Sequence, residues 1–154
     1  MILDVGCGEI PLGDVNCDLF IVDKGHRRKG SVLGVKAIKN FVLCDGQQLP
    51  FRTCIFERVL SSHVIEHVNN PYRFLSEIVR VCKIGGCVDL RLPHRFSYGA
   101  KYKGHINFFD YKWFNKNIQH SFTCVNTRWS PFKFFLSFPN EMQIKIFKGS
   151  PRID

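Results

Sequence analysis

Residues 2–8 read ILDVGCG, an apolar run that leads into a turn with two glycines. A second apolar run ends at Asp18. Small residues after a strand let the backbone approach a ligand closely, and a carboxylate at the end of the neighbouring strand accepts hydrogen bonds from a ribose diol. The pattern therefore predicts a nucleotide-type ligand site, although a lone Gly-x-Gly also occurs in many ordinary tight turns.

The rest of the chain alternates apolar runs with connectors that contain glycine or proline, which predicts a parallel sheet covered on both faces. The predicted strands lie near residues 2–5, 15–18, 40–43, 57–60 and 86–92, and residues 122–129 and 142–147 are predicted to form a final hairpin. We expect one domain over residues 1–154 with an α/β, Rossmann-like fold. Its mostly parallel sheet would have helices on both faces and a C-terminal antiparallel hairpin.

Two helices have clear start signals. Asn70 is a suitable N-cap and Pro71 suits the first turn, so a helix is predicted from there to Lys83, where two glycines follow shortly after. A strand comes directly after it, as in a βαβ crossover. A second helix is predicted to begin at Asp110.

Five segments in a fixed order carry a resemblance to a known family: ILDVGCG (2–8), NCD (16–18), CDGQQLPF (44–51), FERVLSSHVIEHV (56–68) and NPYRFLSEIVRVCKIGGCVDLRLPH (70–94). The chain resembles the class I S-adenosylmethionine-dependent methyltransferases, in particular a compact form of the methyltransferase type 11-like group. The resemblance implies S-adenosylmethionine as cofactor and an enzyme that moves its methyl group to an acceptor. The acceptor, a small molecule or a nucleic acid, is not identified.

The resemblance also implies which residues hold the methionine part of the cofactor. The turn Gly6, Cys7, Gly8 would pass beneath it, and Asp4 would help to hold its ammonium group. The carbonyls of Ser61 and Ser62 would face the same amine, and His63 would border the methyl group.

The adenosine part would lie against acidic residues. By resemblance, Asp18 binds the ribose hydroxyls, Asp45 binds the exocyclic amine of adenine, and the Gly46 backbone meets a ring nitrogen. Asp23 is the alternative ribose acceptor, and Asp18 could instead be an ordinary residue at a strand end.

The chain departs from the family pattern in two places. Ile10 occupies the position of the usual third glycine, and Pro11 follows it. Nine residues separate Gly8 from Asp18, which is too few for the usual helix and second strand. We therefore expect the first helix to be missing or reduced to a turn.

Three histidines are candidates for the catalytic site: His94, His105 and His63. Methyl transfer needs proximity and orientation above all, and a base only when the acceptor must lose a proton. Neutral imidazole is suited to that task near physiological pH. His94 and His105 could equally have a structural role.

Residues 63–67 also match the His-x-x-Glu-His pattern of inverted zinc peptidases. Such a site needs a long helix and a third ligand, whereas here the pattern follows a predicted strand and runs into Asn69-Asn70-Pro71. The family resemblance already accounts for Glu66 and His67, so we expect no metal.

The charge and the cysteine content indicate which partners and which cellular compartment to expect. The net charge is +9, and residues 101–154 hold nine basic but only three acidic side chains. This C-terminal third could meet a nucleic acid, or could simply be a solvated surface. Four aromatic residues that follow the predicted strand at residues 86–92 could form a stacking platform: Phe96, Tyr98, Tyr102 and Phe108. Seven cysteines without a Cys-x-x-Cys pair, no signal peptide and no membrane-spanning run predict a cytoplasmic location and no membrane contact.

Two rival functions remain open. The chain could be a non-catalytic methyltransferase-fold subunit that docks on RNA or on a protein partner, or a nucleotide-binding enzyme of another reaction type. Because the sequence shows no helix before the first strand and no inserted lid, we expect a partner subunit or self-association to complete the site.

Overall fold

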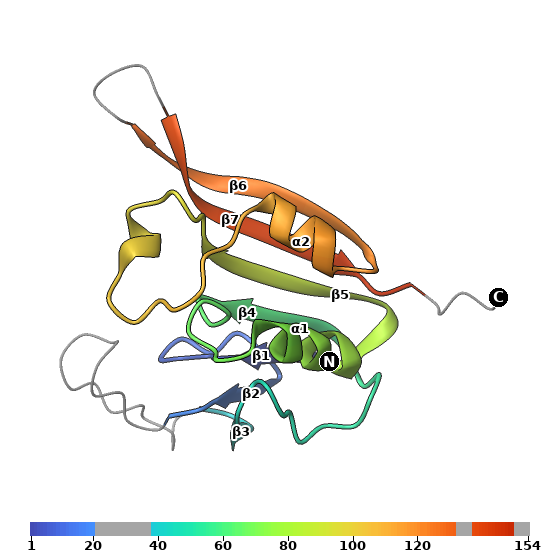
Figure 1. Ribbon diagram of the computed structural model, residues 1–154. Helices are drawn as coiled ribbons and strands as arrows, with labels where there is room; N and C mark the ends of the chain where they lie inside the picture. The colour runs from blue at the N-terminus through green and yellow to red at the C-terminus, as the bar shows by residue number, and fades with distance from the viewer. Residues whose placement is uncertain (21–37, 132–136, 150–154) are drawn as a thin grey trace.

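The computed structural model describes residues 1–20, 38–131 and 137–149 (Figure 1). Their strands form one seven-stranded sheet in the order β3-β2-β1-β4-β5-β7-β6. The strands are β1 Ile2–Val5, β2 Val15–Asp18, β3 Phe41–Leu43, β4 Phe56–Ser62, β5 Cys82–Pro93, β6 Ser121–Pro131 and β7 Ser137–Phe147. Neighbours among β1 to β5 are parallel, and β7 runs antiparallel to both β5 and β6. The predicted Rossmann-like, mostly parallel sheet with a C-terminal antiparallel pair is confirmed.

Both predicted helices begin at their caps. Helix α1 (Pro71–Val81) follows Asn70, whose side chain accepts a hydrogen bond from the backbone N–H of Arg73. Helix α2 (Tyr111–Asn117) follows Asp110, whose side chain caps it in the same way. Among the described residues, no helix has the length and apolar character needed to cross a membrane.

The two α-helices of the described residues lie on the same face of the sheet (Figure 1). The aromatic rings of Tyr72 in α1 and Trp113 in α2 pack together there, with their centroids 5.3 Å apart. The sequence predicts helices on both faces, whereas α1 and α2 both cover one face. The turn between β1 and β2 is too short for a helix, as expected from the nine residues between Gly8 and Asp18. The connection from β2 to β3 includes residues 21–37, which lie outside the described residues, as does the alternative ribose acceptor Asp23.

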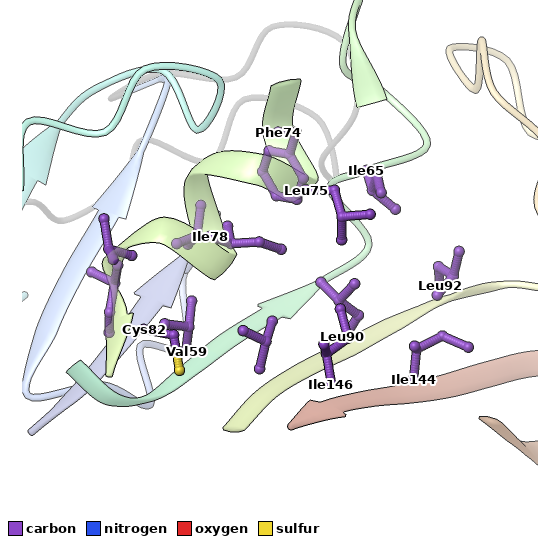
Figure 2. Close-up of a cluster of buried hydrophobic side chains, with 14 of the residues drawn as sticks. Val59, Ile65, Phe74, Leu75, Ile78, Cys82, Leu90, Leu92, Ile144 and Ile146 are labelled. Atoms are coloured by element: carbon purple, nitrogen blue, oxygen red, sulfur yellow. The ribbon is translucent and has the colours of Figure 1, made fainter. Parts of the chain in front are cut away.

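The buried core lies between the sheet and these helices. One row of paired strand residues, Leu3, Val59, Val88 and Ile146, is fully buried. Figure 2 shows Phe74 and Ile78 of α1 in one cluster with Val59 and Ile146 of this row. Burial of large apolar side chains is the main stabilising contribution to the fold.

The opposite face of the sheet is polar. The next row of paired residues is Asp4, Leu60, Asp89 and Lys145. Asp89 accepts hydrogen bonds from Arg58 at 2.6 Å and from Gln143 at 2.7 Å. The strands thus present charge where a doubly wound fold would have a second apolar layer.

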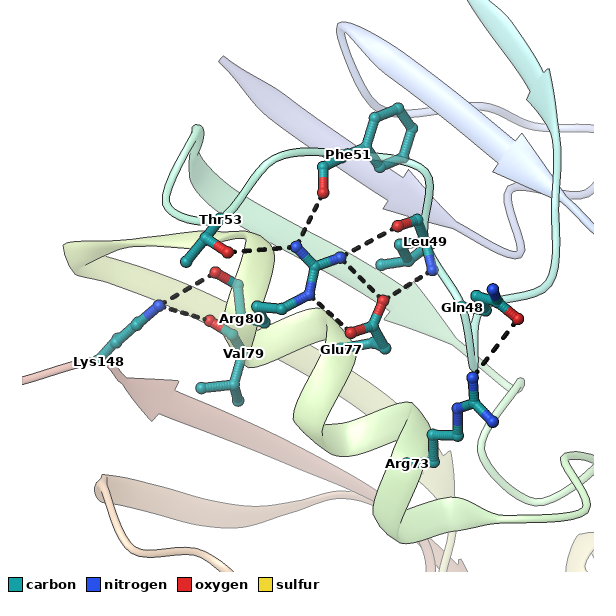
Figure 3. A network of polar contacts seen from close by, with 9 residues as sticks. All are labelled: Gln48, Leu49, Phe51, Thr53, Arg73, Glu77, Val79, Arg80 and Lys148. Atoms are coloured by element: carbon teal, nitrogen blue, oxygen red, sulfur yellow. Dashed lines mark hydrogen bonds and ion pairs between the residues drawn. The ribbon is translucent and has the colours of Figure 1, made fainter.

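A polar network fixes the connection between β3 and β4 against α1 (Figure 3). The Glu77 carboxylate accepts a hydrogen bond from the Leu49 backbone N–H at 2.8 Å, and Arg80 donates to the carbonyls of Leu49 and Phe51. The hydrogen bond from Arg80 lowers the pKa of Glu77. This network holds the segment that carries Asp45.

The end of α1 is capped by a distant lysine. The Lys148 ammonium donates to the backbone carbonyls of Val79, Arg80 and Cys82 at 2.9, 3.1 and 2.8 Å; the first two bonds are drawn in Figure 3. A cation there also interacts favourably with the helix dipole.

Candidate active site

A cleft of about 620 Å³ opens where the carboxyl ends of β1, β2, β3 and β4 meet. Parallel strands bring their ends to one edge of the sheet, which is where open α/β folds bind ligands. The cleft brings together six of the residues that the sequence analysis selected: Gly6, Asp18, Asp45, Gly46, His63 and His105.

A second hollow of about 710 Å³ lies next to the cleft, on the polar face of the sheet. It is lined by the other selected cofactor residues, Asp4, Cys7, Gly8, Ser61 and Ser62. Gly6 and His63 line both spaces. The glycine turn therefore separates two adjoining parts of one candidate site.

The glycine turn needs its glycines for conformation and for space. Gly6 has φ +74° and Gly8 has φ +57°, both in the left-handed region that favours glycine. A Cβ on Gly6 would lie 2.2 Å from Cγ2 of Val64. The backbone N–H groups of Gly6 and Cys7 both donate to the Cys17 carbonyl, at 2.8 and 3.1 Å. The turn is thereby fixed to the end of β2.

Asp18 holds this turn from the neighbouring strand. Its Oδ2 accepts a hydrogen bond from the Gly8 N–H at 3.0 Å, and its Oδ1 accepts one from the Phe20 N–H at 3.2 Å. The side chain is buried and lines the cleft. Asp18 is thus placed to organise the turn and to face a ligand.

Asp45 and Gly46 form the next wall of the cleft. Asp45 accepts hydrogen bonds from the backbone and side-chain N–H groups of Gln47 at 2.8 and 3.2 Å. A Cβ on Gly46 would lie 2.6 Å from Cε2 of Phe74, so only glycine lets this segment pack on α1.

Asp4 lies at the back of the turn, on the polar face. Its Oδ2 accepts a hydrogen bond from the Leu12 N–H at 2.9 Å. Burial raises the pKa of this carboxyl. Asp4 lines the second hollow and not the cleft, so it meets a ligand only from that side.

Two thiols lie on the floor of the cleft, at the ends of β2 and β3. Cys17 and Cys44 are hydrogen-bonded to each other, which raises the pKa of Cys17 and lowers the pKa of Cys44. All seven cysteines are in the reduced thiol form.

The three candidate catalytic histidines lie in different environments. His63 directs Nδ1 at Glu66 and Nε2 at Glu141, at 3.2 and 3.1 Å, and the hydrogen bond to Glu66 raises its pKa. His94 lines neither the cleft nor the second hollow; its Nδ1 accepts a hydrogen bond from the Phe96 N–H. Burial lowers the pKa of His94 and of His105. Of the pair with lowered pKa, only His105 lines the cleft.

The cleft also contains residues that the sequence analysis did not select for the cofactor site. Gln47, His67 and Tyr102 line it. Tyr102 was expected on a stacking platform, and a structural role was favoured for His67. The position of Tyr102 depends on how residues 99–110 fold back over the cleft, for which the sequence gives no local signal.

Comparison with known proteins identifies the family. Residues 3–88 match the family model Methyltransf_11, described as a methyltransferase domain. The chain belongs to this methyltransferase family. The matched part of this methyltransferase domain contains every selected cofactor residue from Asp4 to His63, and neither His94 nor His105.

The ubiquinone/menaquinone biosynthesis C-methyltransferase UbiE of Xylella fastidiosa is 34% identical over 79 residues, which is 51% of this chain and 30% of that protein. This chain thus spans under a third of that relative's length. Among solved structures, a SAM-dependent methyltransferase from Thermotoga maritima aligns over 96% of this chain and 81% of its own, with TM-score 0.70 and 15% identity. A chain in the complex between the Haloferax volcanii Trm112 methyltransferase activator and the putative methyltransferase also aligns. The alignment covers 97% of this chain and 82% of the chain in that complex, with TM-score 0.66 and 12% identity.

S-adenosylmethionine is therefore the cofactor, and the family favours an enzyme over a non-catalytic subunit. The residues present fit this cofactor. The glycine turn offers a surface free of side chains beside two acidic residues.

Proposed function

We propose that this chain binds S-adenosylmethionine across the glycine turn and transfers its methyl group to an acceptor that approaches from residues 95–108. The observation that carries the proposal is the meeting of Gly6, Asp18 and Asp45 at one edge of the sheet. In this proposal Asp18 binds the ribose hydroxyls, Asp45 binds the adenine amine, and the Gly46 backbone meets an adenine ring nitrogen.

The methionine part would lie over Gly6, Cys7 and Gly8 and extend into the second hollow. Asp4 would face its ammonium group from that side. Ser61 and Ser62 follow the same hollow at the end of β4 and would offer carbonyl oxygens to the amine.

The cofactor supplies a methyl group on a positively charged sulfur, so the protein's main task is to hold donor and acceptor in line. His63 lines both parts of the site and would border the methyl group. His105 would meet the acceptor, because it faces the cleft and its lowered pKa keeps the ring neutral. His94 would act as a positioning residue, through its bond to the Phe96 backbone.

Calorimetric titration with S-adenosylmethionine and S-adenosylhomocysteine tests the cofactor site. We expect micromolar binding that Asp18→Ala and Asp45→Ala each weaken by about 10-fold or more, because a hydrogen bond to a charged group contributes about 1.5–3 kcal/mol. Asp14→Ala is the matched control: this carboxylate also accepts a backbone hydrogen bond, from Ile2 at 2.8 Å, but lies outside both hollows. A folded chain that binds neither compound would contradict the proposal.

The acceptor is proposed to be aromatic and anionic, with a nucleic acid as the first candidate. Four aromatic side chains of residues 95–108 are exposed: Phe96 by 66%, Tyr98 by 91%, Tyr102 by 52% and Phe108 by 52%. Arg95, Lys101 and Lys103 lie among them in the sequence. Exposed rings stack on bases and nearby cations meet phosphates.

We expect the double substitution Phe96→Ala/Tyr98→Ala to weaken binding of single-stranded RNA by at least 10-fold, because base stacking contributes about 1–3 kcal/mol per base. Binding of S-adenosylmethionine should not change. Tyr111→Ala removes a ring outside the segment that is 53% exposed and serves as control. Fluorescence anisotropy at two salt concentrations measures the RNA affinity of the wild type and of the double variant. Equal RNA affinities would favour a small acceptor, such as a phenol.

We further propose that a partner subunit or a second copy completes the site. Exposed apolar side chains line both hollows, among them Ile10 and Leu12 on one side and Leu19 and Phe20 on the other. A fully active monomer would contradict this. The reduced form of the seven cysteines supports the proposed cytoplasmic location.

A further inference from the structure

We propose that Glu66, His67 and His105 bind a divalent transition-metal ion, for which zinc is the best match, at the wall of the cleft. One ligand atom from each side chain lies within 4.8 Å of the other two. His67 and His105 also line the cleft. The proposal rests on these contacts alone and does not depend on methyl transfer.

Glu66 provides the strongest indication. Its side chain is only 2% exposed, and its Oε1 lies 3.2 Å from Nδ1 of His63. Its Oε2 is buried and has no hydrogen-bond partner within the ranges that the structure describes. A buried carboxylate oxygen without a partner is costly, and coordination of a cation would remove that cost.

Both histidines have the arrangement typical of metal ligands. Nδ1 of His67 lies 3.0 Å from the Gly104 carbonyl, which can only accept, so Nε2 carries the lone pair of the neutral ring. His105 lies beside the backbone of Ala100. Its Nδ1 is buried and lacks a partner in the described residues. Histidine ligands usually donate their other ring N–H to a carbonyl or carboxylate, which fixes the ring.

Backbone contacts hold the two halves of the site together. The Glu66 carbonyl accepts hydrogen bonds from the N–H groups of Ile106 and Asn107 at 3.0 and 3.1 Å. The Asn107 side chain donates to the Val68 carbonyl at 2.7 Å. The segment with His105 is therefore attached to the turn with Glu66 and His67, and the rings of the two histidines lie 4.5 Å apart.

The donor set decides the class of ion. Two imidazoles and one carboxylate suit zinc and other first-row transition metals, whereas calcium and magnesium prefer oxygen ligands alone. Zinc bonds of about 2.0–2.1 Å need ligand atoms roughly 3.4 Å apart, so shifts of about 1 Å complete the set. Three protein ligands leave a position for water or an acceptor oxygen.

This set differs from the His-x-x-Glu-His pattern, for which we expected no metal. In the structure His63 bonds to Glu66 and Glu141 and lies outside the group. Its place is taken by His105 from another segment, which no spacing rule connects to Glu66.

The test is zinc binding by the full chain after dialysis against a chelator. Competition with a chromogenic zinc indicator should give about one tightly bound equivalent. Glu66→Gln keeps the shape of the side chain and removes its charge, and His105→Phe keeps a ring without a ligand atom. We expect each substitution to weaken zinc binding by more than about 100-fold, because even residues that only hydrogen-bond to metal ligands contribute about 10–100-fold to metal affinity.

Controls separate this site from the cysteines and from the cofactor site. His120→Ala removes a histidine outside the cleft and should bind zinc like wild type. The cobalt form should show d–d bands without thiolate charge-transfer absorption. Zinc binding that survives both ligand substitutions, thiolate absorption, or no binding by the folded wild type would overturn the proposal. If Glu66→Gln does not fold, His105→Phe decides. S-adenosylmethionine titration in chelator reports the cofactor site separately.

Discussion

Gly6→Ala is expected to abolish measurable binding of S-adenosylmethionine and to lower the free energy of unfolding by about 2–5 kcal/mol. The left-handed backbone conformation costs a residue with a Cβ about 1–2 kcal/mol, and the overlap with Val64 adds about 1–3 kcal/mol. Relief of the overlap would move the turn, and the N–H groups of Gly6 and Cys7 would lose their hydrogen bonds to the Cys17 carbonyl. Urea unfolding and calorimetric titration measure the two effects.

Two further variants separate conformation from overlap. Gly85 has nearly the same φ, +78°, but a Cβ there would meet nothing within 4 Å. Gly85→Ala should therefore show the conformational cost alone and bind the cofactor normally. Gly6→Ala/Val64→Ala restores the space and should regain part of the affinity. Equal losses for Gly6→Ala and Gly85→Ala would show that the contact with Val64 is unimportant.

Phe74→Ala is expected to destabilise the chain by about 3–5 kcal/mol, the usual cost of removing a fully buried phenylalanine. Because Gly46 packs directly on this ring, the cavity would also loosen the segment that carries Asp45. We expect the affinity for S-adenosylmethionine to fall in the folded variant. Thermal unfolding with and without the cofactor measures both quantities.

Tyr72→Ala is the matched control for this substitution. It removes an aromatic ring from the same helix, but that side chain is 56% exposed. The expected loss of stability is about 1 kcal/mol or less. If Tyr72→Ala were as destabilising as Phe74→Ala, the contact between Tyr72 and Trp113 would matter more than the buried layer in Figure 2.

Local signals were sufficient for much of the fold. The start of α1 follows from Asn70 and Pro71, and the short turn after Gly8 follows from its length. The end of α1 was predicted at Lys83 but lies at Val81, because Cys82 pairs with Phe56 in the sheet. Such pairing between distant residues is not visible in a local pattern.

The candidate site divides in the same way. The glycine turn, Asp18 and Asp45 could be selected because strand order brings strand ends together. The group of Glu66, His67 and His105 could not, because it depends on backbone hydrogen bonds between residues 66 and 106–107. The family resemblance already accounted for Glu66 and His67, so we did not expect them to be metal ligands.

The lysine cap of α1 has a consequence for the order of folding. Its three carbonyl partners lie 66 to 69 residues before Lys148 in the sequence. During synthesis, Lys148 reaches the end of the helix only when nearly the whole described chain has left the ribosome; the Arg80 carbonyl can accept its other hydrogen bond, from the Cys54 N–H at 3.0 Å, before that. Closing so long a loop is slow, so helix completion and docking of the last strand should form one late, cooperative step.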